Sequence, residues 1–369
     1  MAACGGGSDA QSKTADGKTI VKIQTFNNFG YGKSTDQKPG ADLWAQYEKE
    51  NPNVKVEETV ASSSDEARTA FNTAISSGAN TYDISAVDIA WMPSIRAMGS
   101  KFVDLAPYAN DNSWPDWVKE GGTADGRMIG VGTDIGPTAM CYRKDLFEKA
   151  GLPSDRDKVK EYFGGDSASW DRYFEIGQEY TKKTGKPFID NMGDAAAMMK
   201  MQQKEVFVST DDKIIATDKT VHGIFDEVAE NSDISAHLDS WTDDWNSAFG
   251  SEDGFATIMS PAWLLNNIKG NAGPDFRGWD IADITPGGTG ADQGGSWLVV
   301  PESSPVKEEA ANKKDEYFNN APVGKIFANR AAAIKHIPYI NGQYYDIDAK
   351  FGTAISRGDV VIHSKEGAS

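Results

Sequence analysis

Long apolar runs are missing from this sequence of 369 residues. A helix that spans a bilayer needs about 20 consecutive apolar residues, and no segment of that kind occurs. No part of the chain is therefore expected to cross a membrane. Any attachment to a membrane would have to be covalent.

Cysteine, histidine and clustered basic residues are also scarce. Two cysteines and four scattered histidines lack the ligand spacing of a usual zinc site, so no metal is expected. No phosphate loop or dinucleotide fingerprint occurs, and no cofactor is expected. The net charge of −18, without a dense Lys/Arg cluster, argues against a nucleic-acid partner and favours a neutral or cationic ligand. The acidity could equally serve solubility alone.

The two cysteines have different surroundings. Cys141 lies in an apolar stretch between Met140 and Tyr142 and is expected to be a small buried side chain. Cys4 ends Met1-Ala2-Ala3-Cys4 and precedes Gly5-Gly6-Gly7-Ser8, which resembles the end of a bacterial lipoprotein signal without its charged and apolar parts. A chance terminus is the alternative. Two acyl chains on Cys4 would anchor the protein stably.

The remaining composition is that of a globular protein. A length of 369 residues suggests about two domains, and 39% hydrophobic residues with 10% aromatics are ample for packed cores. Residues 1–18 have the composition of a flexible polar tether, so folded structure is expected from Thr19 on.

Strands alternate with helices in the first part of the folded chain. Apolar and polar residues alternate over 19–26, which predicts a strand, and Ser63-Ser64-Asp65-Glu66 has the capping pattern that opens a helix. The other elements expected here are a helix over 41–50, strands over 54–60 and 82–87, and an apolar segment through Trp91 that Pro93 interrupts. This alternation predicts parallel βαβ units in an open sheet with both faces covered.

A second α/β unit is expected to begin near Gly136. It would hold a strand over 139–142, a helix over 144–150 that Gly151 ends, a long helix over 170–183, and strands over 255–259, 279–284 and 296–300. Trp241 and Trp245 are four residues apart and are predicted to share a helix.

Polar and aromatic side chains follow the expected strands. In open α/β sheets, ligands bind beyond the carboxyl ends of the strands. The residues found there are Asn27 and Asn28, Ser63, Asp88, Trp91, Asp134, Trp263, and Trp297 beside Gly294-Gly295. A sugar offers apolar C–H faces and a rim of hydroxyls, which suit aromatic platforms with paired donors and acceptors. These residues therefore favour a carbohydrate site.

Each of these residues also has a structural interpretation. Asp88 and Asp134 could cap turns, and the Asn27-Asn28 pair could form one. The tryptophans among them could be core residues. A core position is expected for the tryptophans on other predicted helix or strand faces: Trp44, Trp170, Trp245 and Trp279. For Trp241 both interpretations stay open.

Three segments carry a resemblance to a known family. They are 133–147 (TDIGPTAMCYRKDLF), 259–263 (MSPAW) and the start of the chain through Cys4. With interruptions from Cys4 to about Tyr345, the chain resembles the extracellular solute-binding lipoproteins of bacterial ABC importers, in the branch that takes oligosaccharides. The resemblance implies an α/β, two-lobe fold like that of periplasmic binding proteins, with a hinge of crossing segments and an interlobe cleft. Lobe 1 would comprise 19–134 completed by about 297–330, and lobe 2 would comprise 135–296 completed by about 331–369.

The resemblance also implies a function. A solute-binding subunit would capture an oligosaccharide in the cleft and deliver it to a membrane permease, without catalysis. By their places in the matching segments, the expected contacts are Asn28, Ser63, Asp88, Trp91, Asp134 and Trp263. The protein would be a lipid-anchored monomer at the extracellular face of the cytoplasmic membrane, or in the periplasm if an outer membrane is present. The relatives most worth comparing import β-linked sugars like cellobiose or xylobiose.

Two features depart from the family pattern. After Ala311 the family usually continues through a long helix, whereas here the run Tyr317-Phe318-Asn319-Asn320 follows almost at once. The end of the chain, 360–364, also differs from the final helix that the family would have. A shortened first lobe is therefore expected, with a loss of buried apolar surface that bears on stability and binding.

Two other classes of protein stay as alternatives. A glycoside hydrolase needs two carboxylates that flank one bond, and the doublets Asp211-Asp212 and Asp243-Asp244 do not supply them, because adjacent helical residues point in different directions. No nucleophile-elbow pattern occurs either. A glycan-binding surface adhesin would show the same binding residues, and deletion of the neighbouring permease would separate it from an importer subunit.

Overall fold

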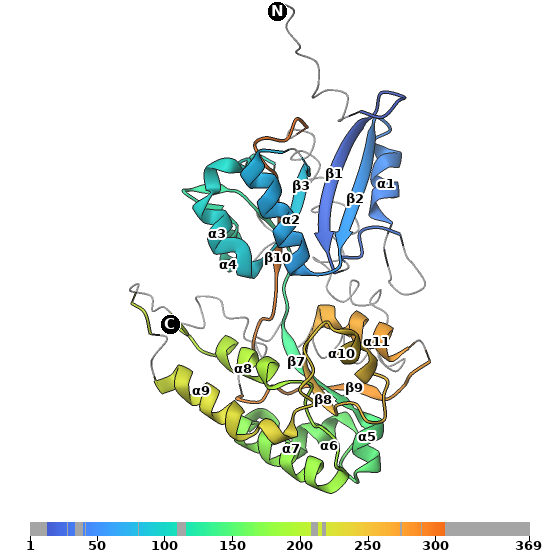
Figure 1. Cartoon of the computed structure of the whole chain (residues 1–369), viewed down its shortest axis with the longest axis vertical. Coiled ribbons are helices and arrows are strands. Elements are labelled where there is room, and N and C mark those ends of the chain that lie inside the picture. Colours follow the sequence, from blue (N-terminus) through green and yellow to red (C-terminus); the bar gives the residue numbers. More distant parts are fainter. Residues whose placement is uncertain are drawn as a thin grey trace, which may run out of the picture. The chain divides into compact units, whose positions relative to one another are not determined.

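The computed structural model describes residues 13–27, 29–33, 40, 42–79, 81–108, 116–207, 213–215, 219–273, 275–288 and 290–306. They form two compact units (Figure 1). Unit 1 holds the described residues up to Ile135 and those from Gly294 on, and unit 2 holds Gly136–Gln293. The predictions on Cys4, Asn28, Asp211-Asp212 and the chain after Ala311 concern residues outside the described ranges.

Unit 1 is built on a five-stranded sheet in the order β2-β1-β3-β10-β6. β1 (Thr19–Phe26) pairs in parallel with β2 (Val54–Ala61) and β3 (Ile84–Asp88), as the alternation of strands and helices predicted. β10 (Ser296–Val299) lies between β3 and β6 (Val131–Asp134) and is antiparallel to both. The expected place of this strand in the second unit is wrong, because its pairing with β3 and β6 puts it in unit 1. The carboxyl ends of β1, β2, β3 and β6 therefore share one edge, at which β10 begins.

Local signals set the helices of unit 1. The predicted cap is confirmed at α2 (Ser64–Ser77), because the Ser63 hydroxyl accepts the Glu66 N–H at 3.2 Å. The interruption predicted at Pro93 is wrong. A 3-10 turn, Ile89–Trp91, leads directly into α3 (Met92–Ala97), and Pro93 lies in the first turn of α3, where its missing N–H would have no helical partner. The remaining elements are α1 (Leu43–Glu50), a 3-10 turn (Gly99–Lys101), α4 (Asp116–Gly121), β4 (Thr123–Ala124) and β5 (Arg127–Met128).

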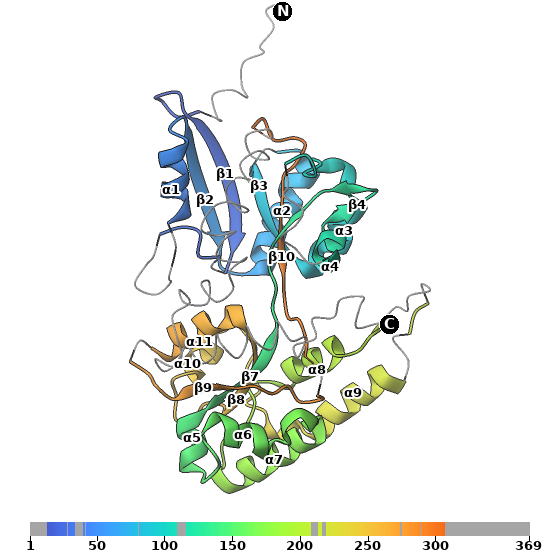
Figure 2. The same cartoon turned by 180° about the vertical axis from the view of Figure 1, so that it is seen from behind.

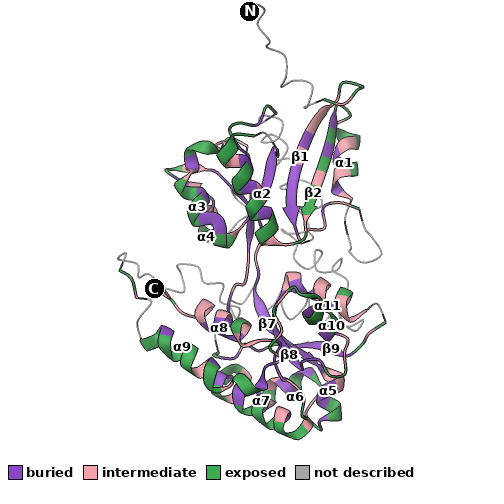
Figure 3. Ribbon diagram, in the orientation of Figure 1, coloured by how far each residue is buried: buried purple, intermediate pink, exposed green. Residues whose placement is uncertain are grey.

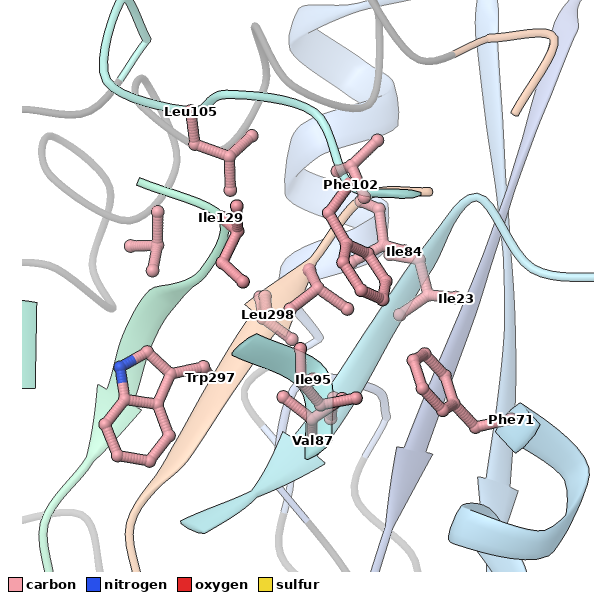
Figure 4. Packing of buried hydrophobic residues seen from close by; sticks show 14 of the residues in the cluster. Ile23, Phe71, Ile84, Val87, Ile95, Phe102, Leu105, Ile129, Trp297 and Leu298 are labelled. Atoms are coloured by element: carbon pink, nitrogen blue, oxygen red, sulfur yellow. The ribbon is translucent and has the colours of Figure 1, made fainter. Parts of the chain in front are cut away.

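The core of unit 1 gathers around its sheet. Figure 4 shows Val87 of β3 and Leu298 of β10 beside Ile95 of α3. Phe71 of α2 stacks on Phe102 with 6.1 Å between ring centroids. All these side chains are buried, so the helices and the five strands share one hydrophobic interior.

Unit 2 has a three-stranded sheet in the order β8-β7-β9. β7 (Thr138–Arg143) pairs with both β8 (Thr257–Pro261) and β9 (Trp279–Ala282), and both pairings are antiparallel. The parallel pairing predicted for the first part of the chain therefore does not extend to unit 2. The connection from β7 to β8 contains several helices and returns the chain in the opposite direction, which the periodicity of the strands themselves does not reveal.

Both faces of the unit 2 sheet are buried. Successive side chains of a strand point to opposite faces, so neighbouring residues join different cores. Met140 and Tyr142 of β7 join one core, whereas Ala139 and Cys141 join the other, which contains Trp279. The predicted burial of Cys141 is confirmed by its exposure of 1%, and burial raises the pKa of its thiol to about 12. Figure 3 shows the buried strands and the exposed outer faces of the helices.

Seven helices belong to the described part of unit 2, and Figure 2 shows them together with its sheet. They are α5 (Lys144–Lys149), α6 (Arg156–Tyr162), α7 (Trp170–Thr184), α8 (Met192–Met201), α9 (Lys219–Glu230), α10 (Asp243–Ala248) and α11 (Leu265–Ala272). Three 3-10 turns accompany them: Gly165–Ser167, Ser232–Ile234 and Ala262–Leu264. Among the described helices of both units, none combines the length and apolarity that crossing a bilayer requires.

Candidate functional site

Two carboxylates flank the first residue of β10 in unit 1. Ser296 pairs in register with Asp88 at the end of β3 and with Asp134 at the end of β6. The two aspartate backbones are thus two strand spacings apart, roughly 10 Å. The Thr133 hydroxyl lies 2.9 Å from Asp134 Oδ1 and 3.1 Å from the Ser296 carbonyl oxygen, to either of which it can donate. The edge at which the sequence predicted ligand contacts therefore brings both carboxylates together.

The surroundings of these carboxyls favour protonation. Burial raises the pKa of Asp134 to about 6, against the opposing hydrogen bonds from Thr133 and the Ser296 N–H. The negative charge of Asp88 raises the pKa of Asp134 further. Burial also raises the pKa of Asp88, while the Ala90 N–H lowers it. A neutral carboxyl can donate and an ionised one accepts, so this edge can pair with sugar hydroxyls in either sense.

Turn and cap roles are present at the same edge. Asp88 Oδ1 accepts the Ala90 N–H at 2.8 Å and caps the 3-10 turn, and half-buried Ser63 caps α2. Asn27 has a left-handed backbone with φ of 55°, as a turn residue would. Asp88, Ser63 and Asn27 therefore have the cap and turn roles that the sequence allowed. Their ligand roles stay predictions.

Trp91 and Trp297 lie in the core of unit 1. Each side chain is 2% exposed. The Trp91 ring lies 5.7 Å from that of Phe26, and Trp297 Nε1 donates to the Val118 carbonyl at 2.9 Å. Glycines make room for the Trp297 ring, since a Cβ at Gly121 would lie 2.7 Å from it. Both indoles thus pack as core residues and offer no open ring face to a solute.

Trp263 occupies a different setting, in unit 2. It follows β8 in the 3-10 turn Ala262–Leu264 and is half-buried. Its Nε1 donates to the carbonyl oxygen of Gln293 at 2.9 Å. Gln293 in turn donates its backbone N–H to the Gly136 carbonyl at 2.7 Å. Trp263 is therefore fixed to Gln293, which pairs with Gly136, and these two residues bound the described part of unit 2.

Trp241 stacks on Trp263, with 6.0 Å between ring centroids and 16° between ring planes. Its side chain is 43% exposed, so part of this indole pair faces solvent. The prediction that Trp241 shares a helix with Trp245 is wrong, because α10 begins at Asp243 and Trp241 has a left-handed φ of 74°. The overlooked signal is Thr242, whose hydroxyl accepts the Trp245 N–H and caps α10.

Other candidate sites in the described ranges are separate from these residues. A cavity of about 510 Å³ in unit 2 is lined by polar residues such as Thr181, Lys186 and Asp253, and by none of the predicted contacts. Within the residues that the structure describes, no three His, Cys, Asp or Glu side chains gather as metal ligands. Asp243 and Asp244 are exposed in the first turn of α10, where acidic residues favour a helix N-terminus.

Comparisons with known proteins agree on one kind of molecule. A family model described as bacterial extracellular solute-binding protein matches residues 42–338. The arabinooligosaccharide-binding protein of Bacillus subtilis (strain 168) is 24% identical over 316 residues, which cover 81% of this chain and 69% of that protein. The crystal structure of an extracellular solute-binding protein of family 1 is 34% identical and covers 95% of this chain and 96% of that one, with a TM-score of 0.66.

A further structure shares the fold. It is the ABC transporter associated binding protein from B. animalis subsp. lactis Bl-04 in complex with β-1,6-galactobiose. It is 20% identical, covers 93% of this chain and 86% of that one, and has a TM-score of 0.71. The two-unit α/β architecture described above is therefore that of sugar-binding proteins of known structure.

Proposed function

Because the chain belongs to the bacterial extracellular solute-binding proteins, we propose that it is the binding subunit of an ABC importer and that its ligand is an oligosaccharide. The observation that carries the proposal is the stacked pair of Trp241 and Trp263, which offers an apolar platform of the kind that sugar rings bind. The names of the relatives, an arabinooligosaccharide-binding protein and a galactobiose complex, support this ligand class.

Polar contacts would come from unit 1. Asp88, Asp134 and Ser63 supply acceptors and donors at the sheet edge, and Asn28 is proposed with them from its place in the sequence. Leaving a buried hydroxyl unpaired costs about 1–3 kcal/mol, so fixed polar side chains select among stereoisomers. Stacked aromatic area then sets affinity, and hydrogen bonds set sugar identity. The burial of Trp91 and Trp297 leads us to leave both out of the proposed contacts.

Transport would couple to binding through a change of population. A ligand shifts a conformational equilibrium by its differential affinity for the two states, and the permease would recognise the liganded state. No catalytic step is part of the proposal. We also propose that the protein acts as a monomer and that a diacylated Cys4 holds it at the outer face of the membrane.

Isothermal titration calorimetry against a panel of sugars tests the ligand class. The panel holds arabinooligosaccharides, β-1,6-galactobiose, cellobiose, xylobiose and an α-linked maltooligosaccharide. We expect saturable binding of at least one β-linked oligosaccharide, with the sugar recovered intact after incubation. Release of monosaccharide would instead support a glycoside hydrolase, and no binding of any member would overturn the proposal. Preference for cellobiose or xylobiose would place the protein in that narrower branch.

Cellular experiments test the transport role. Deletion of the neighbouring permease should abolish uptake of the bound sugar while the purified protein still binds it. Uptake that depends on the permease but not on this protein would contradict the importer role, and a surface adhesin would then be favoured. Incorporation of a labelled fatty acid, absent in Cys4→Ala, is the expected result for the anchor.

A further inference from the structure

Trp241 is held in a backbone conformation that tryptophan rarely adopts. Its φ of 74° lies in the left-handed region, which is a true outlier for so bulky a residue. The side chain is 43% exposed, so burial of the ring does not explain this conformation. Strained backbone of this kind persists where surrounding contacts over-determine it, and it concentrates at functional sites.

The preceding residue, Ser240, is fixed by the start of α8. Its hydroxyl accepts from Asn191 Nδ2 at 3.1 Å and donates to Asp194 Oδ2 at 3.2 Å. Asn191 is itself the N-cap of α8, because its Oδ1 accepts the Asp194 N–H at 2.8 Å. Ser240 is therefore held on two sides by the end of a helix that is distant in sequence.

The residues after Trp241 are fixed by the same segment. Trp245 is 1% exposed, and its Nε1 donates to Asp190 Oδ2 at 2.8 Å. The Trp245 ring lies 5.3 Å from that of Trp241. Asn191 Nδ2 also lies 3.3 Å from Asp190 Oδ2, so Asp190 and Asn191 belong to one network. Burial, followed by the charge of Asp194, raises the pKa of Asp190 well above its usual range.

We propose that Asn191 and Ser240 are positioning residues for Trp241, which they hold stacked on Trp263 in the orientation that receives a sugar ring. This inference rests on the proposed sugar-binding function. The two hydrogen bonds of Ser240 and the Trp245–Asp190 bond fix the chain on either side of Trp241, so the platform exists before the ligand arrives. Such preorganisation strengthens binding because less ordering remains to be done.

The test compares variants that remove the hydrogen bonds of one side chain at a time. Ser240→Ala removes the hydroxyl, and Ser240→Thr keeps it. Asn191→Ser keeps a good helix cap but loses the amide donor. Ser247→Ala is the matched control, because the Ser247 hydroxyl donates to the Asp243 carbonyl at 2.7 Å on an exposed face of α10.

Two readouts separate this inference from the proposed function. The first is the circular-dichroism signal of coupled indoles in the ligand-free protein, defined as the part that Trp241→Phe abolishes. We expect Ser240→Ala and Asn191→Ser to lose it, and Ser240→Thr and Ser247→Ala to keep it. The second is affinity for a sugar that the wild type binds. This affinity should fall at least about two- to twelvefold in Ser240→Ala and Asn191→Ser, because that is the range for one neutral hydrogen bond and each variant removes two bonds.

The outcomes are decisive in each direction. Retention of the indole signal in Ser240→Ala and Asn191→Ser would overturn the inference, and so would its loss in Ser240→Thr. Loss of the signal in the first pair with unchanged affinity would show that the network orders Trp241 without serving binding, and would also overturn it. If the wild type binds no sugar in the panel, the proposed function fails, and the indole signal alone still decides whether the network positions Trp241.

Discussion

The indole N–H of Trp263 donates to the backbone carbonyl of Gln293, 2.9 Å away, although thirty residues separate them in sequence. The same Gln293 pairs with Gly136, the first residue of unit 2. A proposed ligand contact is thus anchored on the backbone at which the chain enters and leaves this unit. Its geometry depends on that backbone as much as on β8.

Gly136→Ala should damage both stability and binding. A Cβ at Gly136 would lie 1.8 Å from the Gln293 carbonyl oxygen and 3.1 Å from Trp263 Nε1, so the backbone must shift. Overpacking of this kind costs about 1–3 kcal/mol or more in the free energy of unfolding. Urea unfolding and calorimetric titration with a bound sugar measure the two effects.

Gly223→Ala is the matched control for Gly136→Ala. Gly223 lies inside α9, and an added Cβ there meets nothing within 4 Å. We expect a gain of about 0.5–1 kcal/mol in the free energy of unfolding and unchanged affinity, because alanine favours a helix over glycine. Equal losses in both variants would remove the special role of Gly136.

Trp241→Ala and Trp263→Ala should each weaken sugar binding. Loss of one stacked indole is expected to cost about 1–2 kcal/mol of binding free energy, a factor of roughly 5–30 in Kd. The control is Trp279→Phe, since Trp279 is 1% exposed and bonded to the Phe249 carbonyl in the core. Calorimetry should find its affinity unchanged. An unchanged affinity in Trp263→Ala would remove that residue from the site.

Trp297→Ala should lower the stability of the protein and leave its sugar affinity nearly unchanged, unlike Trp241→Ala and Trp263→Ala. The ring fills a space between glycines in the core of unit 1, so its removal leaves a cavity that costs about 3–5 kcal/mol of stability. Thermal unfolding should therefore show a large loss, whereas affinity measured well below the melting temperature should change little. A loss of affinity with normal stability would restore Trp297 to the ligand contacts.

Asp134 should make stability depend on pH. Its folded pKa of about 6 lies above the ordinary value of 3.8, so between about pH 4 and pH 6 the folded state holds more protons than the unfolded state. The contribution of this group to stability therefore falls as pH rises through that window. Asp134→Asn does not titrate and should be more stable than the wild type above pH 6, by a margin that shrinks towards pH 4. Urea unfolding of both proteins between about pH 4 and pH 6 measures this margin. A constant difference between their midpoints across that range would contradict the raised pKa of Asp134.

The buried Arg156–Asp280 ion pair should contribute far more to the free energy of unfolding than a surface ion pair does. Arg156 Nη2 and Asp280 Oδ1 are 2.6 Å apart, and their side chains are 10% and 4% exposed. Asp280→Ala removes one partner of this buried ion pair and should cost about 3–5 kcal/mol in the free energy of unfolding. Lys149 and Glu252 are 2.7 Å apart but 56% and 75% exposed, so Glu252→Ala should cause no measurable loss. Similar effects of the two variants in urea unfolding would refute this difference.

The strands and helices could be predicted from the sequence because their signals are local. The alternation over 19–26 gives β1 with its observed bounds, and the Ser63 cap gives the start of α2. The direction of β8 relative to β7 has no such local signal, because the chain between Arg143 and Thr257 could return in either sense. Strand existence was therefore predictable, and strand direction in unit 2 was not.

The environment of each tryptophan could be predicted in part. Trp279 lies on a strand buried on both faces, and its core position follows from that. Trp297 also comes from a strand beside two glycines, yet its burial depends on Gly121 and Gly130, which lie far away in sequence. Thr242 and the two aspartates after it mark a helix start, and this local signal places Trp241 before the helix instead of on it.

The position of β10 in the sheet of unit 1 makes this unit depend on two distant parts of the chain. Thr133 and Ser296 meet across neighbouring strands although 163 positions separate them. Until β10 is in place, β3 and β6 have no strand to join them and expose unpaired edges, which are prone to aggregate. A chain that stops inside unit 2 would leave this sheet open.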